Sequence, residues 1–339
     1  MLTRRVHRST DPYEDMIITR PHRSSFGALV PTNTYTTHIP TPTHTTPLQI
    51  RAPITSYHNP TNSAYVPFYH DGIWTRHSSA SAPPLLPGRH VQLYTFNLSS
   101  RLHHPIPRLL TLLIYLKNLP LSSKPTVIHL QEFHRSALPT LLENLWIQRR
   151  FAITDIIAPV NSEHFTLTLV SLDLQVQRCY RCRFSNTDTN RDMLVTDIAV
   201  AGGGVLRFVN VQLETKPISF GRRYDQLREA AMIMRAEGAR VRAAVLAGDS
   251  SAAWDEEEGH ARKVGLNDAG VLGEGAWRGG EGKEKVLYRG AVRFTSLDGE
   301  VLAVKKVAVG LTYSDGKHRR RVSENGGLVA MLTVGDGRW

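Results

Sequence analysis

Cysteine is scarce in this sequence, which has only Cys179 and Cys182 among its 339 residues. So few cysteines exclude a disulfide framework and predict an intracellular protein, of the nucleus or the cytoplasm. The Cys-x-x-Cys spacing is typical of redox and metal sites, but a four-thiolate zinc site needs a second pair, which the sequence lacks. The surrounding segment alternates polar and apolar residues like a strand, which favours two ordinary thiols.

Long apolar runs are also missing. No run is long enough to cross a membrane, and Met1 to Arg20 lacks the continuous apolar stretch of a secretory signal, so we expect no membrane partner. The absence of acidic residues before Asp11 resembles a transit peptide only faintly. Hydrophobic residues still make up 41% of the sequence, enough for a globular core. The length suits one large domain with a tail, or two modest domains.

Acidic residues are outnumbered, with 30 Asp and Glu against 41 Lys and Arg and a formal net charge of +11. A basic excess favours association with polyanions, so nucleic acid or another phosphodiester is the predicted partner class. Charge alone does not establish such a partner, and the sequence does not indicate an oligomeric state.

Composition divides the chain into three parts. Residues 22–62 consist mainly of Thr, Pro, Ser, His and Asn, and such a stretch lacks the apolar surface needed to offset its ordering entropy. We therefore predict a disordered leader over 1–62. A lead-in over 63–87 carries an aromatic cluster, expected to be pinned onto the domain surface, and then a Ser/Pro-rich stretch; the cluster is Tyr65, Phe68, Tyr69 and Trp74. One domain is predicted over 88–339.

Hydrophobic periodicity within that domain predicts more strands than helices. Strands are expected at 90–96, 125–131, 165–171, 193–200, 206–213, 241–246, 286–288, 301–309 and 327–334. Helices are expected at 105–119, from about Ser136 to Trp146, and at 223–237. Gly202–Gly204 indicates a hairpin turn, and Gly270–Lys285 a long surface loop. Hairpins mixed with strand–helix–strand units point to packed sheets flanked by helices, not to a purely parallel sheet.

Four of the predicted strands end on polar residues that a core does not favour: Asn97, Glu132, Glu214 and Asp249. Burying a carboxylate at such a point is costly unless it is paired or binds a metal. Each has an ordinary explanation on its own, since every strand must end. Their common order and spacing are more specific.

The motifs around these residues resemble the endonuclease/exonuclease/phosphatase superfamily, most closely its tyrosyl-DNA phosphodiesterase 2 branch. The resemblance spans roughly residues 88–336 and implies an α/β (α+β) fold, a four-layer sandwich of two packed mixed β-sheets flanked by helices. The motifs are Thr95-Phe96-Asn97, Leu130-Gln131-Glu132, Asn210-Val211-Gln212-Leu213-Glu214-Thr215, Arg223-Tyr224-Asp225-Gln226-Leu227, Ala247-Gly248-Asp249-Ser250-Ser251, Gly265-Leu266-Asn267-Asp268-Ala269 and Ser323-Glu324-Asn325-Gly326-Gly327-Leu328.

The resemblance implies a phosphodiesterase site. Glu132 would hold Mg²⁺, with Mn²⁺ as an alternative, and Glu324 stands where the family places an Asp near the metal. Asp249 would orient or deprotonate the attacking water, and Asn97 would help hold the phosphate oxygens or the surroundings of the metal. Arg223 is a candidate substrate-binding residue, although an anchoring role on its helix is favoured.

The sequence departs from the family at the catalytic residues. The two family histidines are replaced by Gln212 and Asn325, whose amides donate hydrogen bonds but carry no titratable proton. Ser251 replaces an Asn, and Glu324 replaces an Asp. General acid/base catalysis typically contributes about 10²–10⁴-fold, so we expect low activity from this set.

Two charged runs offer replacement groups. Lys317–Arg321, which precedes Ser323, includes His318 as a substitute imidazole and is also a possible phosphate-binding patch. Asp255–Glu258 offers spare carboxylates. A solvated loop and a solvated acidic turn are the ordinary interpretations of these runs.

Two functional hypotheses follow. The first is a divalent-metal-dependent phosphodiesterase acting on DNA ends, RNA or another phosphodiester. The second is a catalytically degenerate pseudoenzyme, or nucleic-acid-binding module, that retains the fold. A scaffold without a ligand is a weaker third interpretation. The fold alone does not choose among them, because folds of this kind host many activities.

Overall fold

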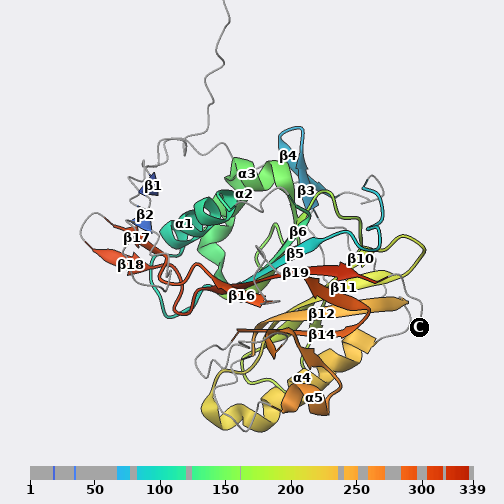
Figure 1. Ribbon diagram of the computed structural model, residues 1–339. Coiled ribbons are helices and arrows are strands. Elements are labelled where there is room, and N and C mark those ends of the chain that lie inside the picture. The colour runs from blue at the N-terminus through green and yellow to red at the C-terminus, as the bar shows by residue number, and fades with distance from the viewer. Residues whose placement is uncertain are drawn as a thin grey trace, which may run out of the picture.

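Two mixed β-sheets stack face to face in the computed structural model, and helices cover their outer faces (Figure 1). The structure describes residues 18–19, 34–35, 67–76, 82–119, 124–160, 162–235, 240–250, 259–271, 284–295, 304–315 and 318–335. The predicted four-layer α/β sandwich is therefore confirmed.

One sheet has seven strands. Its order is β15 (Val292–Thr295), β19 (Gly327–Val334), β5 (Val91–Asn97), β6 (Thr126–His134), β8 (His164–Ser171) and β7 (Phe151–Ile153), with β16 (Val304–Val307) also paired to β19. Strands β5 and β6 are parallel, with Asn97 opposite Gln131. Their carboxyl ends therefore reach the same edge of the sheet.

The other sheet has six strands. Its order is β13 (Asn267–Asp268), β14 (Glu284–Gly290), β12 (Val241–Asp249), β11 (Val205–Gln212), β10 (Asp192–Ala199) and β9 (Val176–Arg183). Strands β11 and β12 are parallel, with Gln212 opposite Asp249, while β10 and β11 form the hairpin predicted from Gly202–Gly204. This sheet therefore also brings two strand ends to one edge.

Three apolar layers hold these elements together. The inner layer, between the sheets, is built from small and branched side chains such as Val127, Leu206 and Ala330. The seven-stranded sheet packs its outer face on α1 (Pro105–Lys117), α2 (Leu138–Glu143) and α3 (Leu145–Arg150). The six-stranded sheet packs on α4 (Phe220–Arg235) and α5 (His260–Lys263). No helix in the described ranges is both long and apolar enough to span a bilayer.

The helix expected from about Ser136 to Trp146 is interrupted. A 3-10 turn covers Arg135–Ala137, and α2 and α3 then meet at Asn144, whose side chain accepts hydrogen bonds from the amides of Trp146 and Ile147. Asn144 caps α3 in this way, since Asn favours helix N-termini over helix interiors. Ser136 does not cap a helix; its amide donates to His134.

The aromatic lead-in forms a hairpin of β3 (Pro67–His70) and β4 (Ile73–Arg76). Trp74 is buried in it and donates from its indole to the carbonyl of Leu142, which joins the hairpin to the end of α2. Tyr65 lies outside the described residues. Within the predicted leader only β1 (Ile18–Thr19) and β2 (Thr34–Tyr35) are described; they pair in a small sheet with β17 (Thr312–Ser314) and β18 (Arg319–Arg321).

The two cysteines lie on opposite faces of β9. Cys179 belongs to the layer between the sheets, whereas Cys182 packs toward the helices. Positions three apart on a strand point to opposite faces, so this pair cannot bind one metal ion or form a disulfide. Burial raises the pKa of the Cys179 thiol to about 12, which keeps it protonated. The interpretation as ordinary thiols is the one that fits.

Candidate functional site

The ends of β5, β6, β11 and β12 meet at one edge of the sandwich, which we call the mouth. Asn97 ends β5, Glu132 lies near the end of β6, Gln212 ends β11 and Asp249 ends β12. The amide nitrogen of Asn97 donates to Oε1 of Glu132 at 3.0 Å and to Oδ2 of Asp249 at 2.6 Å. Gln212 donates to the same Oε1 of Glu132 at 2.5 Å. The structure thus brings four of the predicted site residues, from both sheets, into one hydrogen-bonded cluster.

Glu132 is aimed into this cluster by an irregularity in its strand. The register between β6 and β8 shifts between Leu130 and Phe133, which inserts an extra residue into β6, and Glu132 takes a φ of 51°. Such bulges re-aim side chains, and a non-glycine residue at positive φ stores about 1–3 kcal/mol of strain. The contacts of the carboxylate hold it in this conformation.

The Glu132 carboxylate is half-buried and well supplied with donors. Besides the two side-chain amides, the backbone amide of Ser100 donates to its Oε2. Burial alone would raise the pKa of Glu132, but the hydrogen bonds from Ser100 and Asn97 and the charge of Arg191 outweigh it and lower the pKa below its ordinary value. Glu132 is therefore an anion at neutral pH, as a cation ligand must be.

A buried polar layer supports the cluster from below. Gln131 donates to Thr95 at 3.0 Å within its own sheet and to Asn210 of the other sheet at 2.8 Å. Asn210 donates in turn to the carbonyl of Leu167 at 3.0 Å and to the hydroxyl of Thr168 at 3.2 Å. Gln131, next to Glu132, and Asn210, two residues before Gln212, thus tie the two sheets together, which fixes the position of the cluster above them.

Asp249 depends on the glycine before it. Gly248 has a φ of +153°, and a Cβ built on it would lie 2.0 Å from the carbonyl oxygen of Val211 on β11. Strands β11 and β12 therefore approach closely only because residue 248 has no side chain. This close approach brings Asp249, which is 2% exposed, beside Gln212 at the cluster.

The predicted residues of the 323–325 turn lie next to the cluster without joining it. The hydroxyl of Ser323 donates to the backbone carbonyl of Asn97 at 2.8 Å. Glu324 is exposed and Asn325 half-buried, and neither has a hydrogen bond or ion pair to another described residue. Their catalytic and metal-binding roles remain predictions.

A buried arginine that the sequence analysis did not single out anchors this turn. Arg108 of α1 donates to the carbonyls of Val322 at 2.9 Å, Leu102 at 2.6 Å and Ser99 at 3.2 Å. Burial lowers its pKa to about 10, opposed by the negative charges of Glu132 and Glu324 among others. Arg108 therefore links the loop after β5 to the turn before β19. Its place among apolar residues in a helix was the only signal in the sequence.

Arg223 and Glu214 stabilise the loops near the end of β11. Arg223 is 2% exposed and donates to the carbonyls of Lys216 at 2.6 Å and Glu214 at 3.3 Å. The Glu214 carboxylate accepts from Thr187 at 2.8 Å and from the amide of Asp188 at 2.9 Å. These contacts fit the favoured anchoring role of Arg223 and give Glu214 a structural one.

Several candidates lie outside the described residues: Ser251, the acidic run 255–258 and Lys317. Of the basic run, Arg319–Arg321 form β18, in which Arg319 and Arg321 are exposed while Arg320 donates to Asp315. The Gly270–Lys285 loop is described only at its ends, where Gly270 lies in a 3-10 turn and Glu284 begins β14.

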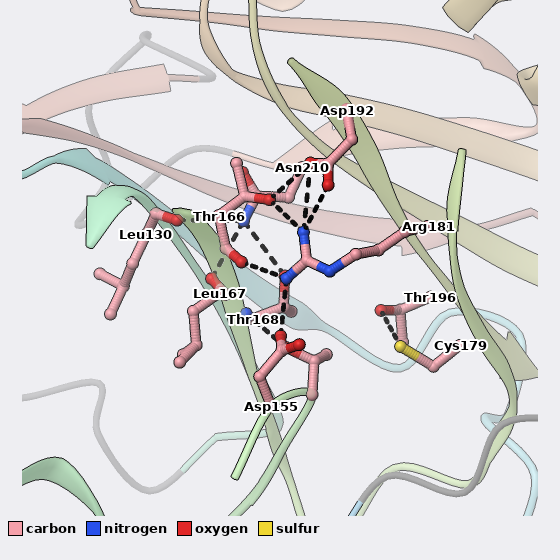
Figure 2. Close-up of polar contacts among 11 residues, drawn as sticks. Leu130, Asp155, Thr166, Leu167, Thr168, Cys179, Arg181, Asp192, Thr196 and Asn210 are labelled. Atoms are coloured by element: carbon pink, nitrogen blue, oxygen red, sulfur yellow. Dashed lines mark hydrogen bonds and ion pairs between the residues drawn. The ribbon is translucent and has the colours of Figure 1, made fainter. Parts of the chain in front are cut away.

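A second ionic cluster joins the sheets beside the mouth (Figure 2). Arg181 of β9 donates to Asp155 at 2.7 Å, to Asp192 at 3.0 Å and to the hydroxyl of Thr166 at 2.8 Å. Asp155 and Arg181 are buried. No motif in the sequence marks this cluster, because its members are far apart in the chain.

The donor set of the main cluster fits a small divalent cation. Oε1 of Glu132 and Oδ2 of Asp249 both accept from the amide nitrogen of Asn97, so the two carboxylates lie on either side of one group. Mg²⁺ is usually held by one or two carboxylates, with water and substrate phosphate completing its shell. Across the described ranges no group of three or more His, Cys, Asp and Glu side chains is placed to hold a metal ion. The cluster itself contributes two carboxylates, those of Glu132 and Asp249.

Solved structures with the same architecture support the fold. A humanized D. rerio TDP2 matches 72% of this chain and 99% of its own at 15% identity and a TM-score of 0.56. C. elegans TDP2 matches 73% and 99% at 16% identity and 0.54. An endonuclease/exonuclease/phosphatase family protein of Bacteroides thetaiotaomicron matches 72% and 95% at 11% identity and 0.52. At these identities the likeness shows the fold alone.

A D. rerio TDP2 structure that holds a single-strand DNA product matches 72% of this chain and 99% of its own at 14% identity and 0.54. No family model and no curated protein sequence matches the chain. The fold predicted from the motifs is thus confirmed by structure, while sequence similarity adds nothing to it.

Proposed function

We propose that this chain is a phosphodiesterase that uses a divalent cation, Mg²⁺ or Mn²⁺, and acts on nucleic acid or a tyrosyl-DNA-like phosphodiester. The observation that carries the proposal is the shared amide of Asn97, which holds the carboxylates of Glu132 and Asp249 together at the mouth between the sheets. A strained, bulged carboxylate that is kept ionised is a poor choice for stability alone, and such strain concentrates at functional sites.

Each residue of the cluster has a proposed task. Glu132 holds the cation, and Glu324 on the adjacent turn is the proposed second carboxylate. When bound, the cation neutralises charge on the phosphate oxygens. Asp249 orients the attacking water and accepts its proton, while Asn97 and Gln212 orient Glu132. Arg223 holds the loop after β11 in place, so its predicted contact with substrate is not needed.

A second candidate function is binding without hydrolysis. It is favoured by Gln212, which binds Glu132 with an amide that cannot transfer a proton. Asn325 and the Ser251 position, which replaces an Asn of the family motif, add to this alternative. The fold and the cation would then be retained for recognition alone.

Hydrolysis separates the two candidates. We expect the purified protein with Mg²⁺ or Mn²⁺ to cleave a generic phosphodiester or a 5′-tyrosyl oligonucleotide, and EDTA to stop cleavage. Glu132→Gln, which removes the charge and keeps the shape, serves as the blank. Activity equal to that of the blank under all conditions would reject the phosphodiesterase in favour of the binding function.

The nucleic-acid partner is testable without catalysis. Arg319 and Arg321 share the exposed face of β18, two residues before the Ser323 that contacts Asn97. We propose that they contact backbone phosphates. Single-strand binding measured in EDTA should weaken as salt rises, with a log–log slope of about 0.7 per phosphate contact.

Replacing both arginines by alanine should therefore reduce that slope by about 1.4. Arg149→Ala, which removes one arginine charge from the exposed end of α3, is the control and should leave the slope unchanged. Equal slopes for all three proteins would exclude β18 as a phosphate contact.

A further inference from the structure

Two histidines lie side by side at the mouth, just beyond the bulge that carries Glu132. His134 of β6 pairs in register with His164, the first residue of β8. Their rings meet edge to face, with centroids 4.8 Å apart. Neither belongs to a family motif. The chain therefore has two imidazoles near Glu132, although Gln212 and Asn325 stand where the family has its histidines.

The two rings have different partners. Nδ1 of His134 accepts hydrogen bonds from the amide of Ser136 at 3.1 Å and lies 2.8 Å from its hydroxyl, while Nε2 lies 3.2 Å from a carboxylate oxygen of Glu163. Both nitrogens of His134 are thereby engaged. The half-buried ring of His164 has no hydrogen bond to any described residue. His164 is thus the ring available to a substrate.

Strand geometry directs His164 toward the opposite sheet. Phe165 and Leu167 of β8 pack against the helices, whereas Thr166 and Thr168 contact Arg181 and Asn210 of the six-stranded sheet. Because side chains alternate along a strand, His164 shares the face of the two threonines. Strand β8 begins at the edge where β6 ends, so this face opens on the mouth.

The surroundings of His164 connect it to the cluster. Burial lowers its pKa below the ordinary value of 6.5; the neighbouring His134 lowers it further, the carboxylates of Glu163 and Glu132 oppose this, and Arg108 adds a smaller lowering. Glu132 belongs to the cluster, and Arg108 anchors the turn beside it. The charge of Glu132, the proposed cation ligand, therefore acts on the His164 ring.

The strand order indicates on which side of the phosphorus atom His164 would lie. Asn97, at the end of β5, contacts Asp249, whereas His164 begins β8, on the other side of β6. In a phosphoryl transfer the attacking and leaving oxygens are roughly in line on opposite sides of phosphorus. If the water is held at Asp249, the leaving oxygen points toward β8.

On the basis of the proposed function, we propose that His164, in its protonated form, is the general acid that protonates the leaving oxygen. The water oxygen forms a bond to phosphorus and gives its proton to Asp249. The bond from phosphorus to the leaving oxygen breaks, and that oxygen takes the proton of His164. Solvent then restores the proton to His164 and removes the one on Asp249.

Leaving-group chemistry tests this role. An alkoxide needs a proton in order to depart, whereas 4-nitrophenolate departs without one near neutral pH. His164→Gln should lower kcat about 10²-fold on a dinucleotide and leave kcat on a nucleoside 4-nitrophenyl phosphate nearly unchanged. His70→Gln, on the exposed hairpin β3–β4, is the matched control and should change neither reaction.

The pH dependence of the unmodified protein gives a second readout that requires no variant. The protonated ring is lost as pH rises through a pKa below 6.5, so kcat on the dinucleotide should fall about tenfold per unit above it. The 4-nitrophenyl ester should not show this fall.

Each other outcome has a definite meaning. An equal loss on both esters would assign His164 a structural or binding role and overturn the inference, while the phosphodiesterase would stand. A loss confined to the dinucleotide in His318→Gln instead would transfer the role to the residue before β18 and also overturn it. No hydrolysis of either ester above the Glu132→Gln blank would reject the proposed function together with the inference.

Discussion

Replacing Gly248 with alanine is expected to reduce the free energy of unfolding by about 4 kcal/mol and to abolish hydrolysis. The added Cβ would lie 2.0 Å from the carbonyl oxygen of Val211, which is backbone and cannot rotate away. The alanine backbone would also be held at a φ of +153°, a conformation that residues with a side chain rarely adopt. Strands β11 and β12 must then separate at the ends that carry Gln212 and Asp249.

Gly221→Ala is the matched control for this change. Gly221 lies in α4, where an added Cβ would meet no atom within 4 Å. Alanine in a helix is about 0.5–1 kcal/mol more favourable than glycine, so this variant should be slightly more stable. Urea unfolding of both variants measures the difference. A Gly248→Ala protein as stable and active as the parent would show that the strands are not held by this close approach.

The strand ends were predictable from the sequence, and the reason is physical. The ends of parallel neighbouring strands reach the same edge of a sheet, so Asn97 with Gln131, and Gln212 with Asp249, were bound to lie together once the strands were placed. The apolar pattern placed the ends of β5 and β11 within one residue, and those of β6 and β12 three residues short. Bringing the first pair of strand ends next to the second requires the two sheets to stack, and that arrangement was implied only by the family resemblance.

The sequence was less informative where partners are distant in the chain. Nothing local shows that Arg108 binds the carbonyl of Val322, or that His164 lies against His134, because strand pairing and loop folding create both contacts. The bulge at Glu132 was equally hidden, since it depends on how β6 pairs with β8. The break at Asn144 carried a signal, an Asn inside a helical pattern, that periodicity outweighed.

Replacing Arg181 with methionine is expected to reduce the free energy of unfolding by about 3–5 kcal/mol at pH 7, because Asp155 keeps its buried charge and loses its ionic partner. Asp155 is 3% exposed and receives the guanidinium of Arg181 at 2.7 Å. Its remaining hydrogen bond, from the Thr154 hydroxyl at 2.8 Å, is too weak to replace an opposite charge.

Arg178→Met is the matched control. Arg178 is 31% exposed and binds Asp197, but Asp197 retains the buried Arg207, which donates to both of its carboxylate oxygens. Removing Arg178 therefore leaves no unpaired buried charge, and its cost should stay near 1 kcal/mol. A similar loss in both variants would mean that packing of the arginine stem, rather than charge, sets the cost.

The pH dependence of Arg181→Met separates charge from packing. Burial raises the pKa of Asp155, and Arg181 and Thr154 oppose that rise. Without Arg181 the folded-state pKa moves further above the unfolded value, so the folded state binds a proton that the unfolded state does not. Lowering pH from 7 toward 5 should then shrink the deficit relative to the parent, because protonation removes the buried charge. A stability difference from the parent that stays constant over this range would assign the loss to packing. The Arg181–Asp155 ion pair would then contribute little to holding the two sheets together.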